Sequence, residues 1–314
     1  MCGLFGFTHY GNNEVKDLQE LTNALAVESA VKGTDATGVA YNKDGKLNIT
    51  KDAKSAYSLN FKHSDSIKAL IGHTRHSTQG SEKHNRNNHP FLGFSKNTRF
   101  ALAHNGVLVN DTELQEKYKL PKSKIETDSY VAVQLLEHQN RLDETSIKFM
   151  AEAVNGSFSF SILDHRDNLY LVKGDSPLHI LHFPKLNMYV YASTEAILWK
   201  ALVDTDLFDE IKAGRYEQVP ISCGDILKVT PAGKLSYSKF EYRDYSYSRI
   251  RPCYWWDYGF SDYGTSKPTE NTYIQDLKIF AKYNGYDDSD VDALLAEGFS
   301  PEEIEEIVYC GYEY

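Results

Sequence analysis

A long series of short apolar segments, interrupted by a pair of helical patterns, restricts the fold of this chain more than any other feature. Apolar runs that end at polar or glycine-rich turns, a pattern typical of strands, fill residues 4–104 and again residues 157–239. The two helical patterns, Asp128–Gln139 and Glu144–Val154, stand between the two series. We therefore expect an α+β fold in which two packed sheets carry helices on their outer faces.

Alternation of apolar residues and the positions of turn residues predict the individual elements. Leu18, Leu21 and Leu25 recur at helical spacing, which predicts a helix over Val15–Val31. A second helix is expected at Thr194–Val203. The predicted strands are Leu4–His9, Ala36–Tyr41, Leu47–Thr50, Ala69–Thr74, Phe100–His104, Ser157–Asp164, Leu169–Lys173, Leu178–His182, Met188–Ala192, Tyr216–Val219, Ile226–Val229 and Leu235–Lys239.

The charge of the chain is concentrated at its C-terminal end. The net charge is −10, and all of it comes from acidic residues after position 286, where no Lys or Arg stands. The preceding residues 1–286 therefore sum to zero and show no basic stripe, which argues against a nucleic-acid partner. No run of about 18 apolar residues predicts a membrane span, and no secretory signal is present. The scattered cysteines Cys2, Cys223, Cys253 and Cys310 indicate reduced thiols, a cytoplasmic location and no structural zinc.

Cys2 could supply two reactive groups from one residue. Removal of the initiator methionine would leave a thiol and a free α-amine on one residue. An α-amine titrates near ~7.7–8.0 and a thiol near ~8.5, so one residue could supply both a nucleophile and its general base. A cysteine at this position could also be accidental, and the rest of the chain decides between the two interpretations.

Four polar clusters stand at the ends of apolar runs. The cluster at Lys32–Gly38 is expected to be a structural turn, and the other three carry candidate site residues. Arg75, within Gly72–Gly80, has a planar guanidinium that could bind both oxygens of a carboxylate. The same sequence is also compatible with an arginine on a surface loop. A turn at Asn105-Gly106 would offer two converging donors for an oxyanion, or would be an ordinary turn. Asp128 could pair with a substrate ammonium or could cap the helix that follows it.

Taken in order, these motifs closely resemble the class II glutamine amidotransferase domain. The order is Cys2-Gly-Leu-Phe-Gly, His73-Thr-Arg-x-Ser-Thr-x-Gly, Asn88-His-Pro-Phe, His104-Asn-Gly and Glu126-Thr-Asp. This domain is the glutaminase half of enzymes such as glucosamine-6-phosphate synthase and phosphoribosyl pyrophosphate amidotransferase, and the resemblance covers about residues 2–235. It implies an N-terminal nucleophile hydrolase, an αββα sandwich of two antiparallel sheets between helical layers.

The resemblance also implies roles for individual residues and a hydrolytic activity. Cys2 would attack the glutamine side-chain amide, and its own amine would act as base. The other implied roles are an oxyanion hole from Asn105 and Gly106, a carboxylate site from Arg75 and Thr78, an ammonium site from Asp128 with the Gly106 carbonyl, and a pocket edge at His76. No metal or organic cofactor is expected. Lys32, His76 and Gln79 depart from residues common in the family, which leaves glutamine specificity open.

We expect three regions: the amidotransferase domain at 2–240, an aromatic-rich linker at 241–271 and an acidic helical appendage at 272–314. In the appendage, helices are predicted at Tyr273–Tyr283, Asp288–Glu297 and Pro301–Cys310, with Ser289 and Ser300 where N-caps are expected. The apolar face they share is expected to pack within the appendage or on the main domain rather than on a partner. Its residues are Leu294, Leu295, Phe299, Ile304, Ile307 and Val308.

Three functions stay open at this point. In the first, the domain releases ammonia from glutamine for a separate synthase that docks on the C-terminal region, because too few residues follow the match for a synthase domain. In the second, it is a stand-alone hydrolase of another γ-glutamyl amide. In the third, it is an inactive binding or regulatory module, which the joint presence of Cys2, Arg75, Asn105, Gly106 and Asp128 argues against.

Overall fold

The computed structural model describes residues 2–11, 15, 17–203, 205, 207–243, 274, 277–278, 281–282, 286–297, 299 and 301–310. The chain divides into two compact units, residues 1–248 and 249–314. Most of the predicted linker at 241–271 and most of the predicted helix Tyr273–Tyr283 lie outside the described residues. The regions 2–240, 241–271 and 272–314 stay predictions.

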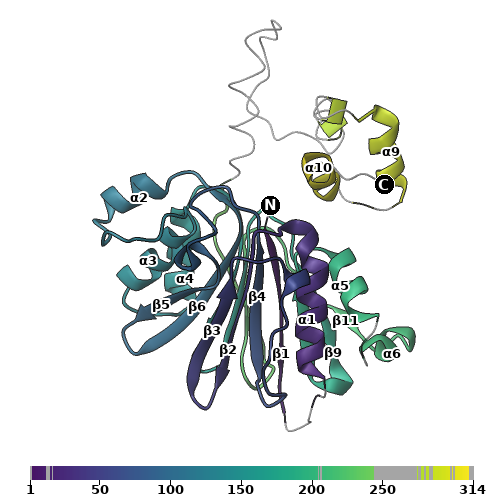
Figure 1. The fold of residues 1–314 in the computed structure, drawn as a ribbon, viewed down its shortest axis with the longest axis horizontal. Helices are drawn as coiled ribbons and strands as arrows, with labels where there is room; N and C mark the ends of the chain where they lie inside the picture. The colour runs from purple at the N-terminus through teal and green to yellow at the C-terminus, as the bar shows by residue number, and fades with distance from the viewer. Residues whose placement is uncertain are drawn as a thin grey trace, which may run out of the picture. The chain divides into compact units, whose positions relative to one another are not determined.

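Two antiparallel sheets form the larger unit (Figure 1). The seven-stranded sheet has the order β11-β9-β10-β1-β4-β2-β3. Its strands are β1 (Gly3–His9), β2 (Ala36–Lys43), β3 (Lys46–Asp52), β4 (Ala69–Arg75), β9 (His179–Phe183), β10 (Met188–Ala192) and β11 (Glu217–Gln218). The six-stranded sheet has the order β13-β12-β8-β7-β6-β5. Its strands are β5 (Phe91–Ser95), β6 (Thr98–Leu108), β7 (Gly156–Asp164), β8 (Leu169–Lys173), β12 (Asp225–Val229) and β13 (Leu235–Lys239).

Helices cover the outer face of each sheet (Figure 1). The seven-stranded sheet packs against α1 (Leu18–Ser29) and α5 (Glu195–Leu202), and the six-stranded sheet packs against α3 (Tyr130–His138) and α4 (Glu144–Ala153). The shorter helical elements are α2 (Asp111–Lys117), α6 (Leu207–Lys212), η1 (Ala30–Lys32), η2 (Ala56–Ser58), η3 (Asn85–Asn87) and η4 (Pro184–Leu186). The predicted α+β sandwich of two antiparallel sheets with outer helices is confirmed.

Strand alternation explains why there are three apolar layers. On β1, Phe5 and Phe7 point toward α1 and α5, whereas Leu4 points toward the other sheet. The layer between the sheets contains many small residues, including Ala101 and Ala103 of β6. Side chains of this size let two sheets approach closely, and because both faces of each sheet are covered, the central strands are buried along most of their length. The edge strands β3, β11 and β13 contain no buried residue.

Some boundaries differ from the sequence-based predictions. The helix predicted over Val15–Val31 begins at Leu18 and ends in η1, and the helix predicted from Asp128 begins at Tyr130. The strand predicted at Phe100–His104 is longer and runs to Leu108, because β7 offers backbone partners along the whole of that extension. The sequence interpretation did not anticipate β5, α2 or α6.

The N-terminus of α4 is held by a capping box at Asp143. Its carboxylate accepts a hydrogen bond from the Ser146 N–H at 2.9 Å, and the Ser146 hydroxyl accepts one from the Asp143 N–H at 3.0 Å. This satisfies two backbone donors that the helix cannot satisfy internally.

We expect Asp143→Ala to lower the free energy of unfolding by about 1 kcal/mol, because the cap acceptor is lost. Asp143→Asn is the matched control, since its side-chain carbonyl can still accept the bond. The exposed Arg141–Asp143 ion pair, 3.4 Å between Nε and Oδ2, should add little. Urea unfolding followed by circular dichroism measures both, and equal losses in the two variants would contradict the capping role.

The smaller unit has an apolar core of its own, to which α9 (Asp288–Ala296) and α10 (Pro301–Cys310) contribute. Leu294, Ile304 and Val308 of the predicted apolar face are buried in this core, so this part of the face packs within the unit. The cap of α9 is Asp287, whose carboxylate accepts from the backbone of Asp290, and not Ser289 as predicted.

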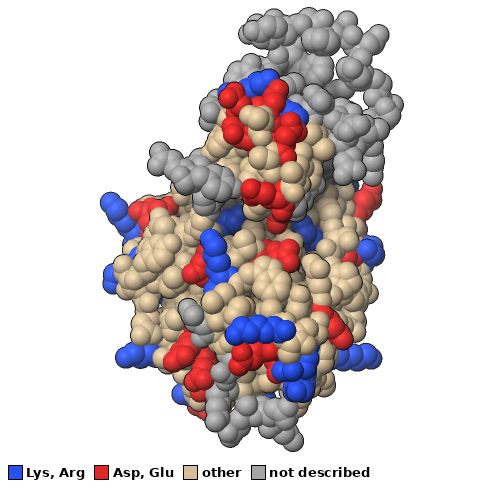
Figure 2. All heavy atoms as spheres, turned by 90° about the vertical axis from the view of Figure 1, so that its right-hand side faces the viewer, with Lys and Arg blue, Asp and Glu red and all other residues tan. Residues whose placement is uncertain are grey.

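Charged side chains of both signs are interspersed on the face of the molecule shown in Figure 2. Among the helices that the structure describes, none has the length and apolar character needed to cross a membrane.

Candidate functional site

Cys2 lies immediately before β1, at the end of the sandwich where β4 finishes. Gly3 pairs with Thr74, so continuing this antiparallel register places Cys2 beside Arg75. The Cys2 side chain is 8% exposed, and its Sγ lies 3.5 Å from the main-chain oxygen of His76. Burial raises the pKa of the Cys2 thiol, and the charge of Arg75 opposes that rise. A thiol held neutral in this way needs a base before it can attack a carbonyl.

Arg75 is the last residue of β4 and is almost completely buried. Its Nη1 donates to Oδ1 of Asn88 at 2.7 Å, and its Nη2 donates to the main-chain oxygens of Gln79 and Gly80 at 2.7 and 2.8 Å. A guanidinium has five N–H donors, and these contacts use three of them. Two donors therefore remain without an acceptor among the described residues, and an anionic group could take them.

Asn105 and Gly106 lie within β6 and not in a turn, which corrects the sequence-based prediction. Gly106 has φ +133°, and a Cβ there would lie 2.0 Å from the main-chain oxygen of Ser157. Only glycine tolerates this backbone, and β6 keeps its pairing with β7 through this position, where Gly106 lies opposite Phe158.

The Asn105 side chain is fully buried, yet neither its Oδ1 nor its Nδ2 has a hydrogen-bond partner among the described residues. On β6 it lies on the same face as Ala101 and Ala103, which pack between the sheets, so its side chain also points between the sheets. The neighbouring His104 main-chain oxygen is 2.9 Å from Nε2 of His73, which fixes β6 against β4 one residue from Asn105. A buried amide without a partner is costly unless a ligand satisfies it.

Asp128 is buried and is held by a segment distant in sequence. Its Oδ2 accepts from the Leu108 N–H at 2.6 Å, and its Oδ1 accepts from the Ser129 hydroxyl at 3.3 Å. It does not cap α3, whose N-cap is Ser129. The charge of Asp128 acts electrostatically on both Cys2 and Arg75, so these three groups share one environment.

The remaining predicted residues, His76 and Thr78, are exposed on the loop that follows β4. The His76 ring lies 3.9 Å from Oδ2 of Asp35, and the same carboxylate oxygen accepts from the Ser77 N–H at 2.7 Å. The structure therefore brings Cys2, Arg75 and Asp128 together and places Asn105 at the same end of the sandwich. The side chains of His76 and Thr78 lie outside that buried group, although the main-chain oxygen of His76 contacts Cys2.

Two residues of this region were missed as candidates. Asn88 holds Arg75, and its place in the Asn88–Phe91 motif was a signal for it. Thr127 has a buried hydroxyl without a partner among the described residues, directly before Asp128. Sequence spacing alone shows neither the Asn88–Arg75 contact nor the burial of the Thr127 hydroxyl.

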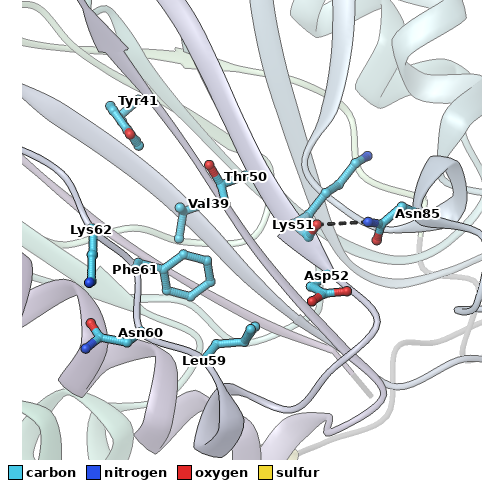
Figure 3. A pocket seen from close by; sticks show the side chains of 10 residues that line it. All are labelled: Val39, Tyr41, Thr50, Lys51, Asp52, Leu59, Asn60, Phe61, Lys62 and Asn85. Atoms are coloured by element: carbon cyan, nitrogen blue, oxygen red, sulfur yellow. Dashed lines mark hydrogen bonds between the residues drawn. The ribbon is translucent and has the colours of Figure 1, made fainter.

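A cavity of about 520 Å³ lies on the outer side of the seven-stranded sheet, beside β2 and β3 (Figure 3). Its apolar floor is made by Val39, Leu59 and Phe61. None of the predicted site residues lines it, so this cavity is separate from the buried group around Cys2.

Comparison with known proteins finds a family match in the central part of the chain. Residues 73–200 match a family model described as a glutamine amidotransferase domain. The chain is 33% identical over 189 residues to the isomerizing glutamine–fructose-6-phosphate aminotransferase of Streptococcus agalactiae, a match that covers 57% of this chain and 30% of that protein. The enzyme of the same description from Staphylococcus aureus is 34% identical over 191 residues, with the same coverage.

Among solved structures, the fold is similar to that of glutamine phosphoribosylpyrophosphate amidotransferase from Bacillus subtilis. The TM-score is 0.60 and the identity 21%, and the match covers 77% of this chain and 50% of that one. A structure described as the allosteric regulatory enzyme of purine biosynthesis gives a TM-score of 0.59 at 18% identity, covering 100% of this chain and 64% of that one. These two similarities concern the fold, and the curated relatives are much longer than the part matched here.

Proposed function

The chain carries a domain of the class II glutamine amidotransferase family, and from this premise we propose that it hydrolyses the side-chain amide of glutamine to glutamate and ammonia. The observation that most supports this proposal is the buried amide of Asn105, which has no partner among the described residues, at the end of the sandwich that holds Cys2. An amide N–H held ready inside the protein is what a developing oxyanion requires.

In the proposed mechanism, removal of Met1 frees the α-amine of Cys2, which takes the thiol proton. The thiolate attacks the glutamine amide carbon, and the side-chain N–H of Asn105 and the main-chain N–H of Gly106 stabilise the oxyanion. The protonated amine gives its proton to the leaving nitrogen, which releases ammonia and leaves a γ-glutamyl thioester. Water, deprotonated by the same amine, then attacks the thioester, releases glutamate and restores the thiol.

The substrate's α-carboxylate would bind the two remaining donors of Arg75, and its α-ammonium would bind Asp128. A buried cation and a buried anion in one environment suit a zwitterionic amino acid, because each charge finds its opposite on the protein. We assign Thr78 and His76 to the pocket edge. Their loop already contacts Arg75 through the oxygens of Gln79 and Gly80, so it lies next to the proposed carboxylate position.

We propose further that the ammonia is used by a synthase on a separate protein. The aminotransferases that match this chain are described as acting on glutamine and fructose 6-phosphate, and the match covers 30% of their length. We assign docking of such a partner to the C-terminal region, residues 241–314.

The proposal is tested by incubating the purified full chain with glutamine, asparagine and a panel of γ-glutamyl amides. We expect release of ammonia and glutamate from glutamine in equal amounts, and intact mass spectrometry showing loss of Met1. Hydrolysis of another γ-glutamyl amide in preference to glutamine would replace the ammonia donor with the stand-alone hydrolase. No turnover of any amide by protein that has lost Met1 would support the inactive module and overturn the proposal.

A further inference from the structure

Lys51 lies on the face of β3 that also carries Leu47 and Ile49, which pack in the layer between the two sheets. It pairs with Gly38 of β2, and a Cβ at Gly38 would lie 2.6 Å from Lys51 Cβ and 2.3 Å from the His89 oxygen. The absence of a side chain at Gly38 therefore opens the path that Lys51 takes. Lys51 is among the residues that line the outer cavity, as are Thr50 and Asp52, but in Figure 3 its side chain points away from the apolar residues Val39 and Phe61.

The Lys51 ammonium binds the backbone of a neighbouring loop. Its Nζ donates to the main-chain oxygen of Asn88 and, at 3.1 Å, to that of Pro90. The Nζ also lies 5.1 Å from the centre of the Phe91 ring. One cation thus binds the segment of residues 88–91 at three points.

The same segment supports the arginine of the proposed substrate site. Asn88 is fully buried, and its Oδ1 accepts from Nη1 of Arg75 at 2.7 Å. Its Nδ2 donates to the Glu82 oxygen at 2.8 Å and to Oδ1 of Asn85 at 3.1 Å, so the amide is fixed in one orientation. Lys51, Asn88 and Arg75 therefore form a continuous chain of hydrogen bonds that ends at the guanidinium.

We propose that Lys51 is a positioning residue of the glutamine site, which acts through Asn88 to hold the Arg75 guanidinium where its free donors meet the substrate α-carboxylate. This inference rests on the proposed function. Because the α-carboxylate is bound equally in the ground state and the transition state, loss of the ammonium should raise KM more than it lowers kcat.

The environment of Lys51 makes the effect depend on pH. Burial, together with the charge of Arg75, lowers the pKa of Lys51 to about 8. The other titratable groups in electrostatic contact with it are the imidazoles of His73 and His89, and burial lowers both of their pKa values, that of His73 to about 3. These rings are neutral at pH 7, so Lys51 is the group that changes charge. It is an ammonium below pH 8 and a neutral amine above it, and the support for Arg75 weakens as the pH rises.

The test compares KM and kcat for glutamine in Lys51→Met, Lys51→Arg and Lys46→Met between pH 6.5 and pH 9.5. Lys51→Met removes the charge and keeps the stem, and we expect its KM at pH 7 to rise about tenfold while kcat changes less than twofold. Lys46→Met is the matched control, because Lys46 is an exposed lysine of the same strand. Its KM should equal that of the wild type.

Lys51→Arg keeps its charge throughout this pH range. The ratio of wild-type KM to Lys51→Arg KM should therefore rise several-fold between pH 7 and pH 9.5. Ionisation of the Cys2 thiol, the Cys2 α-amine and the substrate affects both proteins equally, so it does not change this ratio. A constant ratio, or a KM of Lys51→Met within twofold of the wild type, overturns the inference. Should Lys51→Met fail to fold, the wild-type and Lys51→Arg profiles decide alone.

A binding measurement distinguishes failure of the proposed hydrolysis from failure of the positioning role of Lys51. If the wild type hydrolyses no glutamine, calorimetric binding of L-glutamate to the wild type and to Lys51→Met at pH 7 still tests the positioning role. About tenfold weaker binding by Lys51→Met supports it, and equal binding, or no binding to either protein, overturns it.

Discussion

Replacement of Cys2 by alanine is expected to abolish glutamine hydrolysis and to leave the fold intact. The sulfur is the proposed nucleophile, and removing a nucleophile from a hydrolase of this kind costs at least ~10⁴-fold in kcat. The fold should survive because the described contact of Sγ is a weak one, 3.5 Å from the His76 oxygen. Glutamate release measured with a coupled dehydrogenase gives the rate, and circular dichroism gives the fold.

Cys223→Ala is the control for this prediction, because Cys223 is an exposed cysteine far along the chain. It should retain wild-type turnover. The electrophile 6-diazo-5-oxo-L-norleucine should add one label to the wild type and to Cys223→Ala, and none to Cys2→Ala. Labelling of Cys2→Ala, or turnover by it above a hundredth of the wild-type rate, would place the nucleophile elsewhere.

Replacement of Asn105 by alanine is expected to lower kcat ~10²–10³-fold with little change in KM, because one donor to the oxyanion is lost and that donor acts in the transition state. Folding stability should change little. The Asn105 amide has no partner among the described residues, so its removal breaks no hydrogen bond that the structure shows. Steady-state kinetics and urea unfolding on the same preparation measure the two effects.

Asn42→Ala provides the matched comparison. Asn42 is also a buried strand asparagine, but its Nδ2 donates to the main-chain oxygen of Asp164 at 2.7 Å and to Oδ1 of Asp167 at 2.8 Å. We expect this variant to lose about 1–3 kcal/mol of stability and to keep its kcat. If Asn105→Ala instead behaves like Asn42→Ala, the amide of Asn105 is structural and the oxyanion assignment is wrong.

Local patterns in the sequence were sufficient for most of the fold. The hairpin predicted from Ala36–Tyr41 and Leu47–Thr50 corresponds to β2 and β3, and the helix predicted at Glu144–Val154 corresponds to α4. These elements are predictable because alternation, helical spacing and turn residues act between near neighbours. The N-cap of α9 was predicted two residues too late, at Ser289 instead of Asp287. Local patterns do not distinguish the two positions, because aspartate and serine are equally good N-cap acceptors.

The Asn105-Gly106 pair shows where local information fails. The dipeptide is typical of a turn, and the sequence interpretation placed a turn there. In the structure β7 pairs with β6 through this point, so the glycine's positive φ lies within a paired strand and not in a turn. A dipeptide does not reveal whether another strand lies beside it.

By itself, the sequence determined which chemical groups the protein has and the local elements that carry them, because side-chain chemistry and backbone periodicity are properties of short segments. Only the tertiary structure decided which groups meet. Lys51 reaches Asn88 across 37 residues, the Leu108 N–H reaches Asp128 across 20, and His73 contacts His104 across 31. The His73–His104 contact joins β4 of one sheet to β6 of the other, so it depends on how the two sheets pack face to face. Burial of apolar surface spread over the whole chain, which is not directional, drives that packing.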